Sequence, residues 1–523
     1  MRRASVVRST PHIHVSAAVV AVRSSFAHVN ASSPSNTAPS VAGISGLALH
    51  VPRPRVDLRR FAGWTGADPG KLAAVIGDAF RVPQPDENVY TLAAAAALRL
   101  IDAYAIAPEK VGMLALGTES STDNAVGAVI VRGMIDDALV AQGRRPLPRD
   151  VEVPELKHAC LGGMYALKHA LRYAQTDGSD RVAIVVAADI AQYERGSSGE
   201  PTQGAGAVAM LVEPHARLLQ IDLRRAGSSS DERGWDFRKP FARHFMDEYP
   251  SKGHASHDFP VFNGRYSTVC YVDAVLHALG SQHARTGEDP RALLGDAAAI
   301  LMHRPYEKMP MAALGIAWVW AHVIAGDRDA LDSACRKADV SWDALVAELA
   351  ADARLRDRVR DHGPEYDPLV RTAAVAKHAV QAEAFVQRVR AATSFGSKAV
   401  RELGNLYTAS LPAWIAAALA DAHARDLAWS EREVVLVGYG SGDAAEVWPA
   451  RVSPEWREAA AKIDIEAAFA GAIDLEQGDY EALHDRRMPS RKLPRPTPFA
   501  IAGRGRRYDA GWQDAGIEHY EVV

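Results

Sequence analysis

Short apolar segments rich in β-branched residues recur along this chain of 523 residues. Each is too short to form a helix of its own, and this combination predicts buried strands. The alternation with longer alanine- and leucine-rich stretches predicts an α/β fold, in which helices cover both faces of a sheet rich in parallel strands. The expected strands are 41–51, 111–116, 182–188, the second half of 199–212, 297–302 and 434–437. The expected helices are 86–104, a helix directly after Cys160, 266–279 and 411–419.

Composition excludes several classes of protein. The formal charge of −4 provides no overall basic field for nucleic acid or acidic membranes. The three cysteines, Cys160, Cys270 and Cys335, are widely spaced and form no CxxC or Cys/His cluster, so neither a disulfide scaffold nor a zinc site is indicated. No apolar segment has the length of a membrane span. We therefore expect a cytoplasmic enzyme without a bound metal.

The first part of the chain differs from the rest. Residues 1–56 contain no acidic residue, and arginines punctuate a stretch rich in Ser, Val and Ala. Both organellar transit peptides and disordered leads have this composition. We interpret residues 1–40 as a disordered or transit-like lead.

The segment from Glu155 to Leu167 contains the best candidate for a reactive side chain. Cys160 stands there at the start of an expected helix, whose dipole favours thiolate over thiol. Gly162 and Gly163 leave room beside the sulfur for a thioester and for close backbone packing. This pattern fits an acyl-accepting nucleophile. The alternative is a buried, inert cysteine, which is the commoner role of a single cysteine.

Three more candidates follow expected strands. Glu119 comes after 111–116 among small hydroxylated residues, where α/β folds place chemistry, although the first turn of a helix is an alternative position. His303 ends the strand 297–302 and is either catalytic or a structural hydrogen-bonding residue. Lys308 follows it and would ordinarily be a surface cation.

Other segments indicate organisation more than chemistry. The start of 199–212 resembles a substrate-facing turn, and the glycines of 438–442 would allow backbone N–H groups to point into a site. The aromatic segment 227–265 is long for a loop, which indicates either a functional or a disordered segment. Residues 326–395 read as a charged helical elaboration without a catalytic role, with Cys335 in its core.

Taken in chain order, seven segments of this sequence resemble the 3-hydroxy-3-methylglutaryl-CoA synthase family of the thiolase superfamily. They are Gly117-Thr-Glu-Ser, Ala159-Cys-Leu-Gly-Gly, Glu200-Pro-Thr-Gln-Gly-Ala-Gly-Ala-Val-Ala-Met, Phe259-Pro-Val-Phe-Asn-Gly-Arg-Tyr-Ser, His303-Arg-Pro-Tyr-Glu-Lys-Met, Gly404-Asn-Leu-Tyr-Thr-Ala-Ser and Tyr439-Gly-Ser-Gly. The resemblance extends from about residue 41 to about residue 450 and is weaker in 311–395 and beyond 455.

The resemblance implies a thiolase-like fold, in which two similar α/β halves form a five-layered αβαβα core, usually in a homodimer. We expect the N-terminal half at 41–217 with the cysteine, and the C-terminal half at 218–455 with the histidine and an asparagine. A C-terminal extension at 456–523 would pack on this core. Its sequence is polar from Asp474 onward, with an extended strap at 489–498.

The resemblance also implies an activity, the condensation of acetyl-CoA with acetoacetyl-CoA to HMG-CoA and CoA in the mevalonate pathway of isoprenoid biosynthesis. Cys160 would take the acetyl group, and Glu119 would act as the general acid/base that removes a methyl proton. His303 would polarise the ketone oxygen. Backbone N–H groups of Cys160 and Ser441 would form the oxyanion hole. Asn405 would help to hold the second acyl group.

Lys308 would contact the CoA phosphates. The full substrate-binding set that the resemblance implies is Asn405, Lys308, Ser441, Gly442, Thr202, Tyr407 and Ser410. CoA thioesters are the substrates, and neither a cofactor nor a metal is implied.

The sequence departs from the family pattern at several positions. Leu161 stands where an aromatic residue is common, His158 is unusual before the Ala-Cys pair, and Arg304 replaces a small residue. An extra segment separates Tyr249-Pro from Phe259-Pro. These differences keep the reaction class and leave the acyl chain and its carrier open.

Three hypotheses follow. The first is the CoA-dependent synthase. The second is a relative that acts on acyl-carrier-protein substrates, as in polyketide β-branching, or a ketoacyl synthase III-like condensing enzyme. The third is an inactive scaffold that binds a thiolase partner. Glu119 argues against a decarboxylating ketoacyl synthase, Lys308 favours CoA, and the complete catalytic set argues against the scaffold.

Overall fold

Ten strands form the main sheet of the computed structural model, which describes residues 41–240, 246, 259–261, 263–351 and 354–523. The lead predicted for 1–40 and part of the aromatic segment 227–265 lie outside the described residues. Residues 41–523 group into one unit. The boundaries predicted inside that unit, near 217 and 455, stay predictions.

All six predicted strands are present in the main sheet. Its strands are β1 (Gly43–His50), β4 (Val111–Gly117), β5 (Glu155–Leu156), β6 (Val182–Ala191), β7 (Gly204–Glu213), β8 (Leu219–Ile221), β9 (Gly227–Ser230), β10 (Ala299–Met302), β11 (Glu433–Gly440) and β12 (Ala444–Val452). Their order is β10-β11-β12-β8-β1-β7-β6-β4-β5, and β9 pairs with β12.

The expectation of a sheet rich in parallel strands was wrong. Only β4–β5, β4–β6 and β10–β11 pair in parallel, whereas six pairings are antiparallel. β6 and β7 pair antiparallel across the longer connection 192–203. For β11 and β12 the cause is local, because only residues 441–443 separate these two antiparallel strands. Short connections of this kind join antiparallel neighbours, whereas parallel strands need a crossover. The apolar runs predicted burial correctly but could not reveal strand direction.

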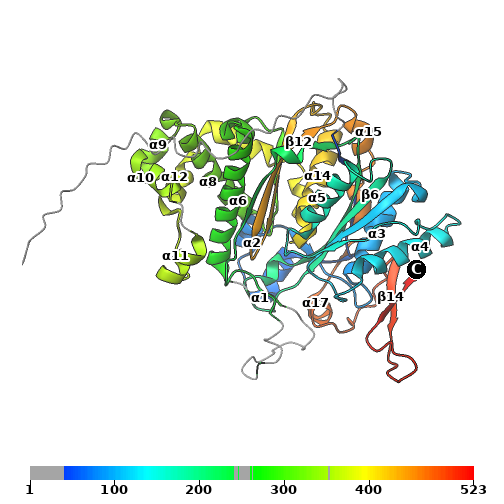
Figure 1. Ribbon diagram of the computed structural model, residues 1–523. Coiled ribbons are helices and arrows are strands. Elements are labelled where there is room, and N and C mark those ends of the chain that lie inside the picture. The colour runs from blue at the N-terminus through cyan, green and yellow to red at the C-terminus, as the bar shows by residue number, and fades with distance from the viewer. Residues whose placement is uncertain (1–40, 241–245, 247–258, 262, 352–353) are drawn as a thin grey trace, which may run out of the picture. The chain divides into compact units, whose positions relative to one another are not determined.

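Helices cover the sheet and also lie inside its curve, as Figure 1 shows. α5 (Gly162–Ala174) and α14 (Ser410–Ala424) lie in the middle, with α5 against β4 and β6 and α14 against β10 and β11. One outer layer contains α3 (Val89–Ala103) and α4 (Gly127–Ala141), and the other contains α6 (Gly264–Thr286) and α8 (Lys308–Ile324). The result is the expected succession of five layers.

The remaining elements are shorter and surround this core. The helices are α1 (Leu58–Thr65), α2 (Pro69–Val75), α7 (Pro290–Gly295), α9 (Arg328–Ala338), α10 (Trp342–Leu349), α11 (Leu355–His362), α12 (Val370–Ala379), α13 (Ser397–Val400), α15 (Trp456–Ala460), α16 (Ile465–Phe469) and α17 (Gln477–His484). Short helical turns are η2 (Pro108–Lys110), η3 (Glu200–Thr202), η4 (Leu223–Arg225), η6 (Phe385–Arg390) and η7 (Tyr407–Ala409). Two small sheets contain β2 (Pro54–Asp57), β3 (Ala79–Arg81) and β13 (Ile473–Asp474), and β14 (Phe499–Arg504) with β15 (Glu518–Val522).

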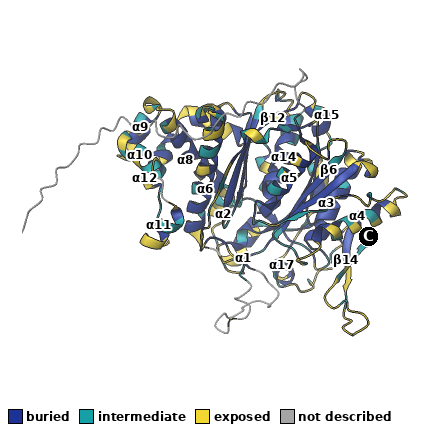
Figure 2. Ribbon diagram, in the orientation of Figure 1, coloured by how far each residue is buried: buried dark blue, intermediate teal, exposed yellow. Residues whose placement is uncertain are grey.

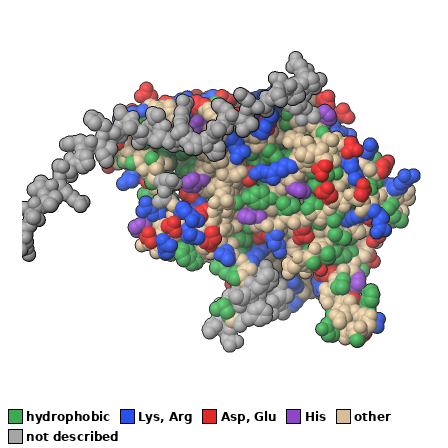
Figure 3. Space-filling model, viewed as in Figure 1, with side chains coloured by type: hydrophobic (Ala, Val, Ile, Leu, Met, Phe, Trp, Pro, Cys, Tyr) green, Lys and Arg blue, Asp and Glu red, His purple; other side chains and the backbone are tan. Residues whose placement is uncertain are grey.

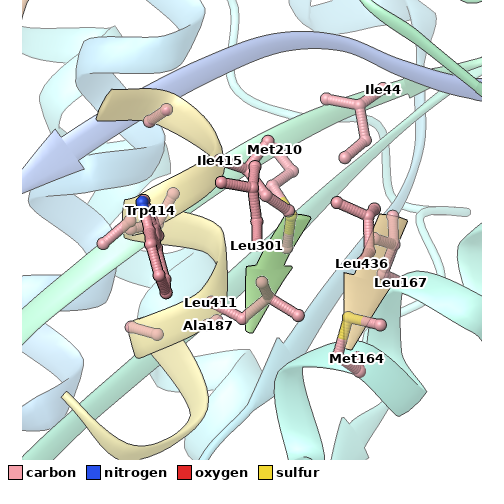
Figure 4. Close-up of a cluster of buried hydrophobic side chains, with 14 of the residues drawn as sticks. Ile44, Met164, Leu167, Ala187, Met210, Leu301, Leu411, Trp414, Ile415 and Leu436 are labelled. Atoms are coloured by element: carbon pink, nitrogen blue, oxygen red, sulfur yellow. The ribbon is translucent and has the colours of Figure 1, made fainter. Parts of the chain in front are cut away.

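The core lies between the two middle helices and the strands around them. Figure 2 shows these strands almost entirely buried. Figure 4 shows apolar side chains of α5 and α14 pointing toward those of the neighbouring strands; the labelled ones are Ile44, Met164, Leu167, Ala187, Met210, Leu301, Leu411, Trp414, Ile415 and Leu436. Burial of such side chains is the main favourable contribution to folding. Strand ends that lead into the site are therefore held by a well-packed interior.

The described residues of 326–395 are mostly helical, as predicted, and one of these helices, α11, contacts α6. Leu355 and Val359 of α11 pack against Tyr266 and Val269 of α6.

Acidic and basic side chains are interspersed on the face of the molecule that Figure 3 shows. No helix in the described parts of the chain combines the length and the apolar character of a membrane span.

The C-terminal tail is more structured than its polar sequence suggested. The strap predicted for 489–498 contains neither helix nor strand. Phe499 after it begins the hairpin β14–β15, which was not predicted and whose register runs from Phe499–Val522 to Arg504–Glu518. Asn88, the N-cap of α3, donates hydrogen bonds to Glu518 at 2.7 Å and to Tyr520 at 2.9 Å. These partners were invisible in sequence because they lie more than 400 residues away.

Candidate active site

Glu119 follows the end of a buried strand, as the sequence predicted. β4 ends at Gly117, and the Glu119 amide donates a hydrogen bond of 2.8 Å to Oδ1 of Asp189 on β6. The same oxygen accepts from Thr118 Oγ1 at 2.9 Å and from Ser120 Oγ at 2.7 Å. One buried carboxylate thus fixes the backbone that presents Glu119.

Asp189 also connects this strand end to a second part of the site. Its Oδ2 accepts a hydrogen bond of 3.0 Å from the Thr408 amide in η7. Sequence reasoning missed Asp189. The signal that could have found it is a carboxylate within an apolar strand, since a buried charge requires partners.

Cys160 lies two residues before α5 and is 7% exposed. Gly163 explains how neighbouring elements approach it, because a Cβ there would lie 2.9 Å from the Thr408 carbonyl oxygen and 2.6 Å from Ala187 Cβ. The close packing expected beside Cys160 is therefore present. The cluster of buried apolar and aromatic residues around the sulfur consists of Cys160, Ala191, Tyr193, Phe237 and Tyr407.

The Glu119 carboxylate lies in a low-dielectric environment next to one cation. Lys239 Nζ is 3.1 Å from Glu119 Oε1. Burial, together with the Asp189 charge, raises the pKa of Glu119 to about 7, although Lys239 and the Cys160 thiol act in the opposite direction. A carboxyl group with this pKa can both accept and return a proton at neutral pH.

The Cys160 thiol does not have the lowered pKa expected from its position before a helix. Burial and the charges of Glu119 and Asp189 raise its pKa well above the usual value, and Lys239 opposes them. α5 begins only at Gly162, so the effect of its dipole on the sulfur is outweighed. Cys160 is therefore a thiol in the free protein and must release its proton as it attacks.

Asn405 organises the segment 404–410 through its side chain. Its Oδ1 accepts from the Tyr407 amide at 2.9 Å and from Ser410 Oγ at 3.0 Å, and its own amide donates to the Thr202 carbonyl at 2.9 Å. Tyr407 has a φ of +45°, in the left-handed region that non-glycine residues rarely occupy. The Asn405 bond supports this backbone, and the Tyr407 ring belongs to the cluster around Cys160.

His303 ends β10, as predicted, and is 1% exposed. Its ring stacks on Tyr439 of β11, with 6.2 Å between centroids. Neither ring nitrogen has a hydrogen-bond partner among the described residues, which is unusual for a buried polar group and points to a ligand contact. Burial lowers the pKa of His303 to about 3, so its imidazole is neutral at neutral pH.

Ser441 and Gly442 form the turn between β11 and β12. Gly440, just before them, touches the Cys160 segment: a Cβ there would lie 2.7 Å from His158 Cδ2 and 2.9 Å from the Leu161 nitrogen. The absence of a side chain at Gly440 thus brings this turn beside the nucleophile.

No direct contact joins His303 to Cys160 or Glu119 in the described part of the chain, but parallel pairing of β10 with β11 places His303 next to the strand that leads to Ser441.

A buried ion-pair network supports the same turn and was also missed from sequence. Arg233 Nε donates to Asp443 Oδ1 at 3.1 Å, and its guanidinium also pairs with Asp273 and Asp231. Atoms of Asp236, Cys270 and Asp443 that could ligate a metal lie within 4.8 Å of one another. Arg233 already balances the Asp443 charge, which favours an ion-pair network over a metal site.

A cavity of about 590 Å³ opens at the Cys160 segment. Its lining combines three cationic and three acidic side chains, and consists of His158, Ala159, Ser230, Asp231, Glu232, Phe237, Arg238, Lys239, Arg354, Ser441, Gly442 and Asp443. The volume suits a small-molecule thioester arm. Lys308 is the exposed first residue of α8 and lies outside this lining, so its predicted contact with CoA phosphates stays a prediction.

Comparison with known families gives this arrangement a context. The model of the hydroxymethylglutaryl-coenzyme A synthase N-terminal domain matches residues 38–217, and the model of the C-terminal domain matches residues 228–488. The chain belongs to the hydroxymethylglutaryl-CoA synthase family. This assigns it to the acyltransferases and confirms the family and enzyme class that the seven segments predicted.

Individual relatives agree with this assignment over most of their length. Hydroxymethylglutaryl-CoA synthase of Haloferax volcanii is 27% identical over 448 residues, which cover 85% of this chain and 91% of the relative. The cytoplasmic hydroxymethylglutaryl-CoA synthase of Mus musculus is 26% identical over 471 residues, covering 88% of this chain and 79% of the relative.

Solved structures confirm the thiolase-like fold. MvaS in complex with 3-hydroxy-3-methylglutaryl coenzyme A is 27% identical, with a TM-score of 0.68 and coverage of 92% of this chain and 99% of that one. The HMG synthase of the curacin biosynthetic pathway, in complex with an acetyl donor-ACP, is 20% identical, with a TM-score of 0.62 and coverage of 92% and 100%.

Proposed function

We propose that this member of the hydroxymethylglutaryl-CoA synthase family condenses acetyl-CoA with acetoacetyl-CoA to HMG-CoA through an acetyl-Cys160 intermediate. The observation that carries the proposal is the hydrogen-bond contact between the buried side chains of Glu119 and Cys160. Both have a neighbour in the cavity lining, since Lys239 contacts Glu119 and Ala159 precedes Cys160. A nucleophile and a proton acceptor at one acyl carbon are what the chemistry requires.

The first half-reaction forms the acyl-enzyme. Cys160 Sγ attacks the acetyl carbonyl, the C–S bond to CoA breaks, and the thiol proton leaves with CoA as its thiol. Backbone N–H groups of Cys160 and Ser441 would stabilise the developing oxyanion. Because burial keeps Cys160 protonated, its proton has to move during attack, and Glu119 is the adjacent group with a suitable pKa.

The second half-reaction forms the carbon–carbon bond. Glu119 takes a proton from the acetyl methyl group, and the resulting electron pair adds to the ketone carbon of acetoacetyl-CoA. The C=O π bond of the ketone breaks as the carbon–carbon bond forms, and the ketone oxygen becomes a hydroxyl by taking the proton that Glu119 removed. The neutral His303 ring, which carries one N–H because its pKa is about 3, would donate a hydrogen bond to that oxygen. Asn405 would hold the second acyl group, and water would then hydrolyse the Cys160 thioester.

The acyl carrier and the assembly are further parts of the proposal. Lys308 was the sequence argument for CoA, and it lies outside the cavity lining. A carrier protein is therefore the alternative donor to test, as in the complex of the curacin enzyme. We also propose that the protein is a cytoplasmic homodimer and acts early in isoprenoid synthesis. A measured molecular mass in solution of twice the 56.3 kDa of one chain would support the dimer.

Intact-protein mass spectrometry tests the nucleophile. Brief exposure to acetyl-CoA should add one acetyl group to the wild type and to Cys335→Ala, and none to Cys160→Ala. Addition of acetoacetyl-CoA should then remove the acetyl group from the wild type, and a branched C6 thioester should form. If only an acetylated carrier protein acetylates the enzyme, that carrier protein takes the place of acetyl-CoA as the donor in the proposal. Absence of acetylation from both donors would overturn it.

A further inference from the structure

Lys239 is the one cation in direct contact with the proposed base among the described residues. Its Nζ lies 3.1 Å from Glu119 Oε1, and the two side chains are only 18% and 5% exposed. A pair this sheltered from water interacts more strongly than an exposed surface pair. The contact joins residues 120 positions apart and was not indicated by the sequence.

Two aromatic rings hold the Lys239 ammonium in place. Nζ lies 5.2 Å from the centroid of the Tyr407 ring and 5.8 Å from that of Phe237. Both rings belong to the cluster around Cys160. Cation–π contacts of this kind favour a fixed position of the charge over the rings. The Lys239 side chain also lines the cavity, so it contacts both the proposed base and the space that is open to a substrate.

We infer that Lys239 is a positioning residue, which holds the Glu119 carboxylate ionised and oriented for removal of the acetyl methyl proton. In that step the methyl C–H bond breaks, an O–H bond forms on Glu119, and the electron pair goes to the new enolate. A neutral Glu119 cannot perform this step. The inference rests on the proposed function, because it assigns Lys239 a part in the same proton transfer.

Of the other groups that act on the Glu119 pKa, the Cys160 thiol works in the same direction as the lysine through a hydrogen bond, but it carries no positive charge. Asp189 of β6 is negative, and burial itself disfavours the carboxylate. Loss of the Lys239 charge therefore leaves Glu119 without a compensating cation. The titratable and charged groups that act on Glu119 or are influenced by it are Asp189, Lys239, Cys160, Tyr193 and Tyr407.

The test compares Lys239→Met and Lys239→Arg with the wild type. We expect the acid limb of kcat/KM for condensation to lie near pH 7 in the wild type and to move up by about 1–3 pH units in Lys239→Met. Lys239→Arg keeps the positive charge, so the acid limb of its pH profile should lie where that of the wild type does. Lys337→Met, at an exposed lysine of α9, should also leave the position of the acid limb unchanged. A rate reduced by the same factor at every pH would overturn the inference. An increased KM with an unmoved limb would also overturn it, because that result would indicate a substrate contact only.

A second measurement needs no acyl substrate and separates this inference from the proposed function. The charge of Glu119 raises the pKa of Cys160, so the rate at which iodoacetamide alkylates Cys160, followed by peptide mass spectrometry across pH, should show the ionisation of Glu119 as an inflection. We expect this inflection near pH 7 in the wild type and about 1–3 pH units higher in Lys239→Met. A moved inflection in a protein that no donor acetylates would refute the proposed function and keep the electrostatic role of Lys239. An unmoved inflection and an unmoved acid limb in an active enzyme would refute the role of Lys239.

Discussion

Replacement of Arg233 by Met is expected to destabilise the protein in a strongly pH-dependent way. The Arg233 side chain is 2% exposed and the Asp443 side chain is fully buried, with 3.1 Å between Nε and Oδ1. Removal of one partner leaves a buried carboxylate without its cation, which costs about 3–5 kcal/mol. With an unfolding entropy of about 2.1 cal/mol/K per residue, a chain of this size loses about 3–5 °C of Tm.

The pH dependence has a definite sign. Burial raises the pKa of Asp443 to about 7 although Arg233 lowers it, so the pKa in Arg233→Met lies higher still. A carboxyl group whose pKa is raised on folding stabilises the folded state at low pH and loses this contribution as pH rises through the folded pKa. The Tm deficit of Arg233→Met should therefore be largest above pH 7 and shrink toward pH 5.5, where Asp443 is protonated in both proteins.

Thermal unfolding from pH 5.5 to 8.0 checks this expectation. Arg233→Lys, which keeps a charge, should lose less than Arg233→Met. Arg60→Met removes an exposed pair with Glu476 and should change Tm by less than about 1 °C. A Tm deficit of Arg233→Met that is equally small at all pH values would refute the reasoning, because burial of the ionised Asp443 carboxylate would then not require Arg233.

Three further substitutions test the site itself. Glu119→Gln should reduce condensation by about 10²–10⁴-fold, and wild-type activity should fall below pH 7 because the pKa of Glu119 is about 7; a flat pH–rate profile contradicts this. Gly440→Ala should slow acetylation and lower stability by about 1–3 kcal/mol, because its Cβ would lie 2.7 Å from His158. Gly63→Ala, where nothing lies within 4 Å, is the matched control and should keep wild-type stability and activity. Asn405→Ala removes two buried hydrogen bonds and should raise KM for acetoacetyl-CoA about tenfold or more with acetylation retained, as steady-state kinetics would show.

The sequence predicted the elements of this fold better than their directions. Apolar runs such as 182–188 identify a strand because burial on both faces requires them. They do not distinguish a strand that is followed by a crossover from one after which the chain returns at once, and the pairing of β11 with β12 is of the second kind. The hairpin β14–β15 escaped prediction because only Phe499 and Ala500 of its strand residues are buried, so no apolar periodicity marks it.

The site shows the same division between local and distant information. Cys160, Glu119 and His303 stand at strand or helix ends, a position that local sequence reveals. The partners that set their chemistry are distant: Asp189 lies 70 residues from Glu119, and Lys239 lies 120 residues from it. The raised pKa of Cys160 follows from burial and neighbouring charges, and neither can be read from a helix start alone.

The contact between Asn88 and the hairpin β14–β15 has a consequence for folding during synthesis. Asn88 and Glu518 are separated by 430 residues, so a ribosome that adds 5–20 residues per second needs about 20–90 s to produce the second after the first. Throughout that time the start of α3 lacks its final partners. The start of α3 therefore stays without these hydrogen bonds until a segment near the C-terminus has been translated. We expect chaperones to bind the growing chain mainly during this interval.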